Sequence, residues 1–118
     1  IKENFGLRIA RYVNQLTDVS RSEDGNRAAR KRKDRVHLSM AEPQAKTVKL
    51  ADLISNTSSI VEHDANFAKV YMAEKAALLE VLTDGDRSLL LKAASLVDGY
   101  NHELLNPSIR ALLRGKDK

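Results

Sequence analysis

Apolar residues recur at helical spacing along most of this chain. Phe5, Ile9, Val13 and Leu16 follow one another at intervals of three and four residues, which is typical of one face of an amphipathic helix. No segment alternates apolar and polar residues for long enough to predict a strand. The pattern therefore predicts an all-α fold.

Turn and capping residues divide this pattern into separate helices. The segment 17–26, TDVSRSEDGN, is predicted to be a loop, and Asp64 is predicted to be an N-cap. Pro43 and Pro107 suit first helical turns, and Gly115 suits a stop. The helices are predicted over about 1–16, 27–40, 43–62, 66–82 and 87–105, with a last one from Pro107.

The composition narrows the chemistry that the chain can perform. It has 118 residues, enough for one domain, and only 4% are aromatic, so the core is expected to be aliphatic. Without cysteine, a metal site has to use oxygen and imidazole ligands. No stretch approaches the roughly 20 apolar residues of a membrane span, and no signal peptide is recognisable. We expect a cytoplasmic protein with no membrane partner.

The net charge of +4 owes much to one run, RAARKRKDR at Arg27–Arg35. Such a run can bind a nucleic acid, a membrane surface or a phosphorylated small molecule, or it can be a solvated helix face. It contains no aromatic residue on which bases could stack, which argues against nucleic acid as the partner.

A polar stripe borders the apolar arc of the helix predicted over 43–62. It consists of Asp52, Asn56, Ser59 and, near the helix end, His63. At this border a carboxylate is expected to be partly desolvated and to need a cation. That cation is either Mn²⁺ or Mg²⁺, with the carboxamide holding a bound water or substrate oxygen, or a basic side chain such as Lys49. His63 itself is expected to be a surface residue.

The sequence VKLADLISNTSSI resembles the final motif of the HD-domain phosphohydrolases. It is most similar to the branch that hydrolyses guanosine tetraphosphate, which includes the hydrolase domains of Rel and SpoT proteins and small stand-alone hydrolases of animals. The motif of that branch is Lys-Leu-Ala-Asp, three variable residues and Asn, matched here by residues 49–52 and Asn56. NFGLRIARYVNQLTDVS and RAARKRKDRVHLSMAEPQAKTVKLAD resemble the neighbouring segments, so the similarity covers about residues 1–82.

This resemblance implies a fold, an activity and a set of site residues. Residues 1–83 would form the C-terminal portion of an HD-domain/PDEase-like helical bundle, and 84–118 a helical extension of the same domain. The activity would be release of pyrophosphate from guanosine 3′,5′-bis(diphosphate). Asp52 would be the last ligand of one Mn²⁺ ion, and Asn56, Ser59 and Tyr71 would contact the nucleotide. From its position alone, Tyr71 is instead expected to lie half in the core.

The resemblance also shows what the chain lacks. The family's other metal ligands are a His and a His-Asp pair, its catalytic carboxylates are a Glu-Asp pair, and all of these precede the segment that matches Ile1. The dipeptide His63-Asp64 follows the motif helix instead, and no catalytic residue is assigned in this chain. Because one carboxylate does not hold Mn²⁺ firmly, and because the chain opens without Met, we expect an inactive remainder of a longer hydrolase with exposed apolar faces.

Two other hypotheses stay open from the sequence. One is a catalytically inactive helical module that binds a nucleotide or nucleic acid through the basic run. The other is a helical piece that self-associates into a homo-oligomer. For the hydrolase, guanosine pentaphosphate and a phosphorylated dinucleotide remain alternative substrates.

Overall fold

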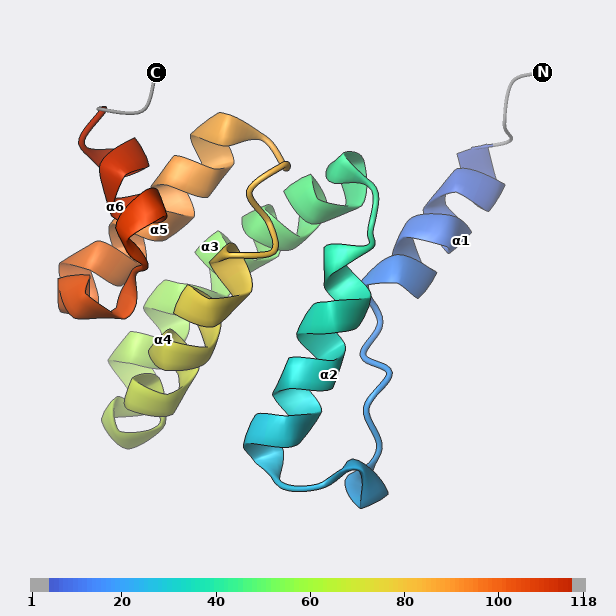
Figure 1. The fold of residues 1–118 in the computed structure, drawn as a ribbon, viewed down its shortest axis with the longest axis horizontal. Helices are drawn as coiled ribbons and strands as arrows, with labels where there is room; N and C mark the ends of the chain where they lie inside the picture. The colour runs from blue at the N-terminus through green and yellow to red at the C-terminus, as the bar shows by residue number, and fades with distance from the viewer. Residues whose placement is uncertain (1–4, 116–118) are drawn as a thin grey trace.

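Helices form most of the region that the computed structural model describes, residues 5–115 (Figure 1). That region contains no strand, so the all-α prediction is confirmed. The α-helices are α1 (Phe5–Leu16), α2 (Arg27–Ser39), α3 (Pro43–His63), α4 (Ala65–Leu79), α5 (Arg87–Asn101) and α6 (Pro107–Leu113). Two short 3₁₀ helices, η1 (Ser22–Asp24) and η2 (His102–Leu104), lie in the connections before α2 and before α6.

Local capping explains where the helices begin. The predicted N-cap Asp64 accepts a hydrogen bond from the backbone N–H of Phe67, and Asn26, Asp86 and Asn106 cap α2, α5 and α6 in the same way. Prolines lie in the first turns of α3 and α6, as predicted.

The C-terminal ends of the helices agree with the predicted positions less closely than the N-terminal starts do. Gly115, with φ of 72°, follows α6 and confirms the predicted stop. Helix α4 ends at Leu79, and a turn rather than a helix leads to Leu82. The predicted helix start at Ile1 lies outside the described residues.

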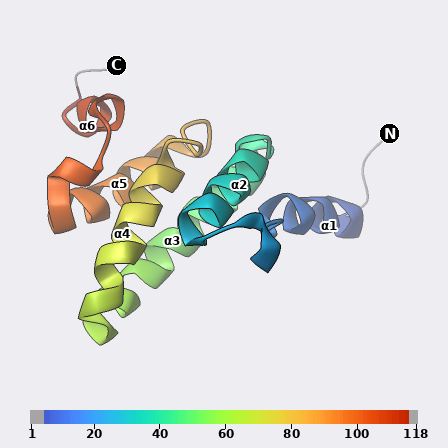
Figure 2. The same ribbon diagram turned by 60° about the horizontal axis from the view of Figure 1, so that its bottom comes forward.

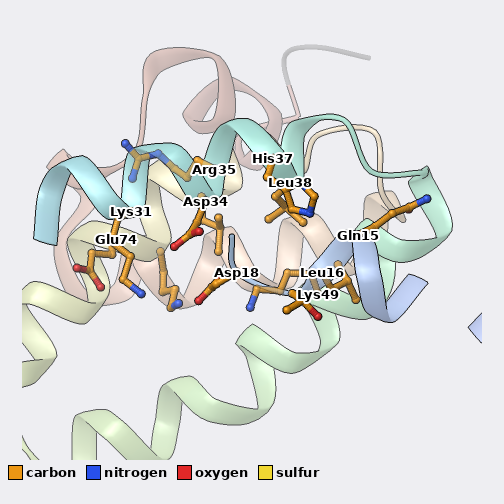
Figure 3. A pocket seen from close by; sticks show the side chains of 13 residues that line it. Gln15, Leu16, Asp18, Lys31, Asp34, Arg35, His37, Leu38, Lys49 and Glu74 are labelled. Carbon is orange, nitrogen blue, oxygen red and sulfur yellow. The ribbon is translucent and has the colours of Figure 1, made fainter. Parts of the chain in front are cut away.

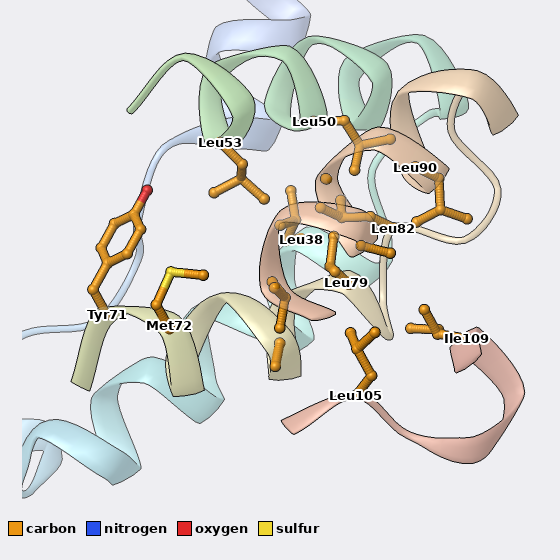
Figure 4. Packing of buried hydrophobic residues seen from close by; sticks show 14 of the residues in the cluster. Leu38, Leu50, Leu53, Tyr71, Met72, Leu79, Leu82, Leu90, Leu105 and Ile109 are labelled. Atoms are coloured by element: carbon orange, nitrogen blue, oxygen red, sulfur yellow. The ribbon is translucent and has the colours of Figure 1, made fainter. Parts of the chain in front are cut away.

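The hydrophobic core lies between α3, α4 and α5, and α6 contributes to it from one side (Figure 4). Helix α3 turns one face inward because its inward positions recur at three and four residues. The largest side chains that are fully buried are Leu50, Met72, Leu79, Leu82, Leu90, Leu105 and Ile109, and Leu38, Leu53 and Tyr71 are nearly so. The core is aliphatic with one tyrosine, in keeping with the composition.

A buried lysine anchors the first turns of α3. The ammonium of Lys46 donates hydrogen bonds to the Asp84 carboxylate at 2.8 Å and to the Ser39 carbonyl oxygen at 2.9 Å. These contacts tie α3 to the end of α2 and to the turn between α4 and α5. The position of α3, which carries the predicted site residues Asp52, Asn56 and Ser59, is thereby fixed against two other parts of the chain.

Helices α1 and α2 lie beside this core, with α1 extending away from α4–α6 (Figures 1 and 2). Arg11 and Gln15 of α1 donate hydrogen bonds to the carboxylate of Glu42, which precedes α3. Tyr12 and Leu16 pack against the core, and Leu38 is the buried residue of α2.

Several apolar side chains of α1 and α2 are exposed to solvent. They include Ile9 and Val13, which led to the prediction of α1, as well as Val36 of α2 and Met40, which directly follows that helix. Apolar spacing predicted α1, but of that apolar series only Leu16 packs against the core, together with Tyr12. Self-association through such a surface stays a prediction.

Candidate functional site

Asp52 and Asn56 lie side by side on an exposed flank of α3. The Asn56 Nδ2 donates a hydrogen bond of 3.0 Å to Asp52 Oδ1, and the Lys49 ammonium lies 3.7 Å from Asp52 Oδ2. The Asp52 side chain is 55% exposed, so the protein covers the carboxylate only in part. Asp52 is one residue, about 100°, from the inward-facing Leu53, so it lies at the border of the buried face. The predicted pairing with Lys49 is present.

Ser59 and His63 continue the stripe toward the end of α3, and both are exposed. The His63 Nδ1 lies 2.8 Å from the carbonyl oxygen of Ser59, which accepts a hydrogen bond from it. This local contact occupies one imidazole nitrogen and agrees with the expectation that His63 is a surface residue. The Ser59 side chain remains accessible for a ligand.

Tyr71 of α4 is a core residue rather than a half-buried one, with 6% of its surface exposed. Its hydroxyl makes no hydrogen bond of normal geometry to a described residue, although Thr57 is close by. Burial raises the pKa of the Tyr71 phenol, the Thr57 hydroxyl offsets part of the rise, and the negative charge of Asp52 adds to it. The fold therefore brings Tyr71 within electrostatic reach of Asp52.

A cavity of about 130 Å³ opens between the end of α1, α2, α3 and α4 (Figure 3). Lys31 of α2, Lys49 of α3 and Lys75 of α4 line it, and all three are half-buried. Because Lys49 also contacts Asp52, the cavity adjoins the polar stripe on α3. We call these three side chains the lysine cluster.

The sequence analysis named Lys49 only as a possible partner of Asp52 and as part of the motif, and it did not predict that Lys31, Lys49 and Lys75 line one cavity. Lys31 belongs to the basic run, but Lys49 and Lys75 are single lysines on other helices, and nothing in their spacing indicates that they meet. Two other residues of the basic run form salt bridges with acidic residues: Arg27 pairs with Glu74, and Lys33 pairs with Asp24. The run itself lacks aromatic residues, yet the fold places the Arg27 guanidinium 5.5 Å from the centre of the Phe67 ring.

Two of the three carboxylates that line the cavity accept hydrogen bonds from groups other than the lysine cluster. Asp34 accepts hydrogen bonds from the backbone N–H groups of Val19 and Ser20 and from the Ser20 hydroxyl. Both oxygens of Glu74 accept hydrogen bonds from Arg27. Of the acidic residues lining the cavity, only Asp18 has no such contact among the described residues.

The pKa of Lys75 is lowered mainly by burial and further by two neighbouring lysines. These lysines are Lys49 and Lys31, and the negative charges of Glu74 and Asp18 offset only part of the effect. The ammonium of Lys75 also lies 4.9 Å from the centre of the Tyr71 ring. A group with these neighbours gains stability when an anion enters the cavity.

The described residues do not by themselves fit a Mn²⁺ centre. Asp52 offers one carboxylate and Asn56 one amide oxygen, and within residues 5–115 no group of three or more His, Cys, Asp or Glu side chains could hold a metal ion. Asp52 can therefore serve as one ligand of a larger site, as the resemblance implies, but not as a site alone.

Comparison with known proteins adds no relative. No family model, curated protein or solved structure matches the chain. Among the described residues, no helix has the length and apolar character that crossing a membrane requires.

Proposed function

We propose that this chain belongs to a metal-dependent phosphohydrolase that releases pyrophosphate from guanosine tetraphosphate. The observation that carries the proposal is the exposed Asp52–Asn56 pair, which adjoins the lysine cluster through Lys49. Phosphoryl transfer needs an oxygen ligand for a metal and fixed positive charge for the phosphates, and these two features lie next to each other here. The order of residues in KLADLISN supports the same reaction.

The predicted site residues on α3 have roles consistent with their exposed positions. Asp52 supplies one oxygen ligand to Mn²⁺, and Asn56 both orients that carboxylate and contacts the nucleotide. Ser59, one turn further along the exposed flank, offers its hydroxyl to the nucleotide. Tyr71 is buried together with its hydroxyl, so its predicted contact with the nucleotide would require this part of α4 to open.

The proposal requires more metal ligands than the described residues supply. Oxygen-rich sites of this kind use several protein ligands, and Asp52 is one. The test therefore uses the complete protein, and it follows Mn²⁺ binding by titration together with Mn²⁺-dependent release of pyrophosphate. Ratios of kcat/KM then rank guanosine tetraphosphate against the pentaphosphate and a phosphorylated dinucleotide.

Asp52→Asn is the decisive variant, because it keeps the shape of the side chain and removes the ligand charge. We expect turnover to fall by more than about 100-fold, beyond the loss usual for a residue that only supports a ligand. Asp98→Asn is the matched control, since Asp98 is an exposed residue of α5. Retention of Mn²⁺-dependent turnover by Asp52→Asn would refute the proposal.

Tyr71→Phe separates a role in the core from a role in binding. Removing a buried hydroxyl that lacks a hydrogen bond leaves stability unchanged or higher. If the hydroxyl contacts the nucleotide, the same variant raises KM. An unchanged KM would restrict Tyr71 to packing.

Nucleotide binding without catalysis is the second candidate function. The observation in its favour is that the described residues assemble the cations of a binding site but not the ligands of a metal site. In this case guanosine tetraphosphate binds saturably, Asp52→Asn binds it equally well, and no pyrophosphate is released. Binding to nucleic acid instead would weaken steeply as salt is raised.

A further inference from the structure

An open groove with a volume of about 410 Å³ lies between α2 and α4. Its lining side chains recur at intervals of three and four residues on each helix, so each wall is one face of its helix. They are Arg27, Ala28, Lys31, Arg32 and Arg35 of α2 and Val70, Ala73, Glu74 and Ala77 of α4. Among the described residues its lining includes none from α3, so the groove lies apart from the flank that carries Asp52. We call it the α2–α4 groove.

The two walls of the α2–α4 groove differ in chemistry. The α4 wall is mainly apolar, with Val70 44% exposed and with Ala73 and Ala77 beside it. Small alanine side chains allow another helix to approach closely, and an exposed valine gives that helix an apolar contact. The α2 wall is mainly basic. A ligand of this groove therefore meets an apolar surface on one side and positive charge on the other.

The positive charge of the groove exceeds its negative charge. Glu74 is the acidic residue among the lining side chains, and both of its oxygens accept hydrogen bonds from Arg27. Burial alone would raise the pKa of Glu74, but the hydrogen bond from Arg27 and the nearby positive charges outweigh burial, and the pKa is lowered. Four basic side chains against one acidic side chain leave three positive charges in excess.

Arg32 and Arg35 are the basic side chains of the groove that the protein compensates least. Lys31 also lines the cavity beside Asp34, and its charge helps to lower the pKa of that carboxyl, so it is partly compensated. Arg32 is exposed, and Figure 3 shows the Arg35 guanidinium turned away from that cavity. Within residues 5–115, neither arginine forms a salt bridge.

The occupant of the α2–α4 groove has to satisfy both walls. A nucleic acid would pair with the arginines, but it would place a polar backbone against Val70, and no aromatic side chain lines the described groove for base stacking. An amphipathic helix with an acidic face matches both walls, because its apolar residues cover α4 while its carboxylates face α2. We propose that the α2–α4 groove binds an acidic amphipathic helix of a partner protein.

The length of the groove defines the motif of this partner. At 1.5 Å per residue, the lining segments 27–35 and 70–77 each extend about 11–12 Å, which is roughly two turns of a bound helix. The partner therefore presents apolar residues at three- and four-residue spacing over about eight positions, with Asp or Glu on the adjoining face. So short an interface predicts a transient complex.

The experiment is a titration of the complete protein into a fluorescent helical peptide, followed by anisotropy. The peptide has Leu along one face and Glu along the adjoining face. A control peptide has the same composition in an order that leaves neither face continuous. We expect the first peptide to bind saturably and the control at least about tenfold more weakly. Equal binding of the two peptides would overturn the proposal.

Val70→Lys separates helix binding from general attraction of anions. It removes the apolar contact and adds a positive charge, so affinity for the peptide falls by about tenfold, whereas affinity for duplex DNA would stay or rise. Val61→Lys is the matched control, since Val61 is an exposed valine of α3 that does not line the groove. Unchanged or tighter peptide binding by Val70→Lys would refute the proposal, as would saturable binding of duplex DNA alone.

Arg32→Glu tests the basic wall, with Arg87→Glu at an exposed position of α5 as its control. We expect about a tenfold loss of affinity for the peptide in Arg32→Glu and none in the control. In a series of peptides that each have one Glu changed to Lys, one peptide should bind Arg32→Glu more tightly than it binds the unaltered protein. Such a rescue shows that the variant is folded, and its absence throughout the series would count against the assigned contact.

The result is independent of hydrolysis at Asp52. Neither Arg32 nor Val70 lines the cavity beside Lys49, so both variants should keep any Mn²⁺-dependent release of pyrophosphate. Asp52→Asn, in turn, should bind the peptide as the unaltered protein does. Loss of peptide binding in Asp52→Asn would contradict a groove that is separate from α3.

Discussion

The Lys46–Asp84 ion pair offers the sharpest test of how α3 is held in place. The Lys46 side chain is only 6% exposed, whereas that of Asp84 is 53% exposed. Asp84→Asn removes the charge that faces the buried ammonium and leaves Ser39 as its remaining strong acceptor. We expect this variant to be less stable, because the lysine cannot move to water without displacing the start of α3.

The size of the expected loss in folding free energy follows from the uneven burial of Lys46 and Asp84. Exposed ion pairs contribute about 0–1 kcal/mol, and breaking a fully buried pair costs about 3–5 kcal/mol. With one partner buried and the other half in water, and with an amide left as a weaker acceptor, we expect a loss of about 1–2 kcal/mol. For a chain of this length that corresponds to a fall in Tm of roughly 3–12 °C.

The measurement is urea unfolding followed by circular dichroism, with the midpoint compared at constant m-value. Asp98→Asn, an exposed position of α5, is the control and is expected to stay within about 0.5 kcal/mol of the unaltered protein. Lys46→Met is expected to cost less than Asp84→Asn, since it removes the buried charge together with its pairing. If Asp84→Asn matched the control, or if Lys46→Met were the more damaging change, the argument from burial would be wrong.

Two further predictions concern the tight packing of Gly85 against Leu50 and the pH dependence of the stability that Asp34 contributes. A Cβ at Gly85 would lie 2.9 Å from Leu50 Cδ1, so Gly85→Ala is expected to cost about 1–3 kcal/mol in thermal unfolding, and an unchanged Tm would contradict this. Burial alone would raise the pKa of Asp34, but hydrogen bonds from Ser20 and Val19 outweigh it and the pKa is lowered. The resulting stabilisation is present above the ordinary Asp value of 3.8 and is lost as the pH falls through the lowered pKa. The stability gap between the unaltered protein and Asp34→Asn should therefore narrow below pH 3.8, and a constant gap would refute the assignment.

Local sequence was sufficient to predict the helices and most of their ends. Capping and turn residues act through hydrogen bonds to backbone atoms a few positions away, so Asp64, Pro43, Pro107 and Gly115 had the predicted effects. The end of α4 was placed too late, because the residues after Leu79 keep an apolar pattern while forming a turn that carries Leu82 into the core. Apolar spacing there indicated burial rather than helix.

The candidate site was predicted only as far as one helix extends. Asp52, Asn56 and Ser59 share a flank of α3 because helical geometry alone brings residues at three- and four-residue spacing together. Their exposure depends on which other helices cover that flank, and a helical wheel has no information about this. The sequence therefore placed Asp52 beside the buried face but did not determine how much of its side chain the neighbouring helices cover.

The tertiary structure alone decided which distant charges meet. The sequence by itself determined an all-α chain, its helix starts and the Asp52–Asn56 pair, all of which depend on contacts within a few residues. The burial of Lys46 and Tyr71 and the convergence of Lys31, Lys49 and Lys75 depend on the packing of α2, α3 and α4. Packing angles are set by side chains from several helices at once, so no single segment of the sequence contains them.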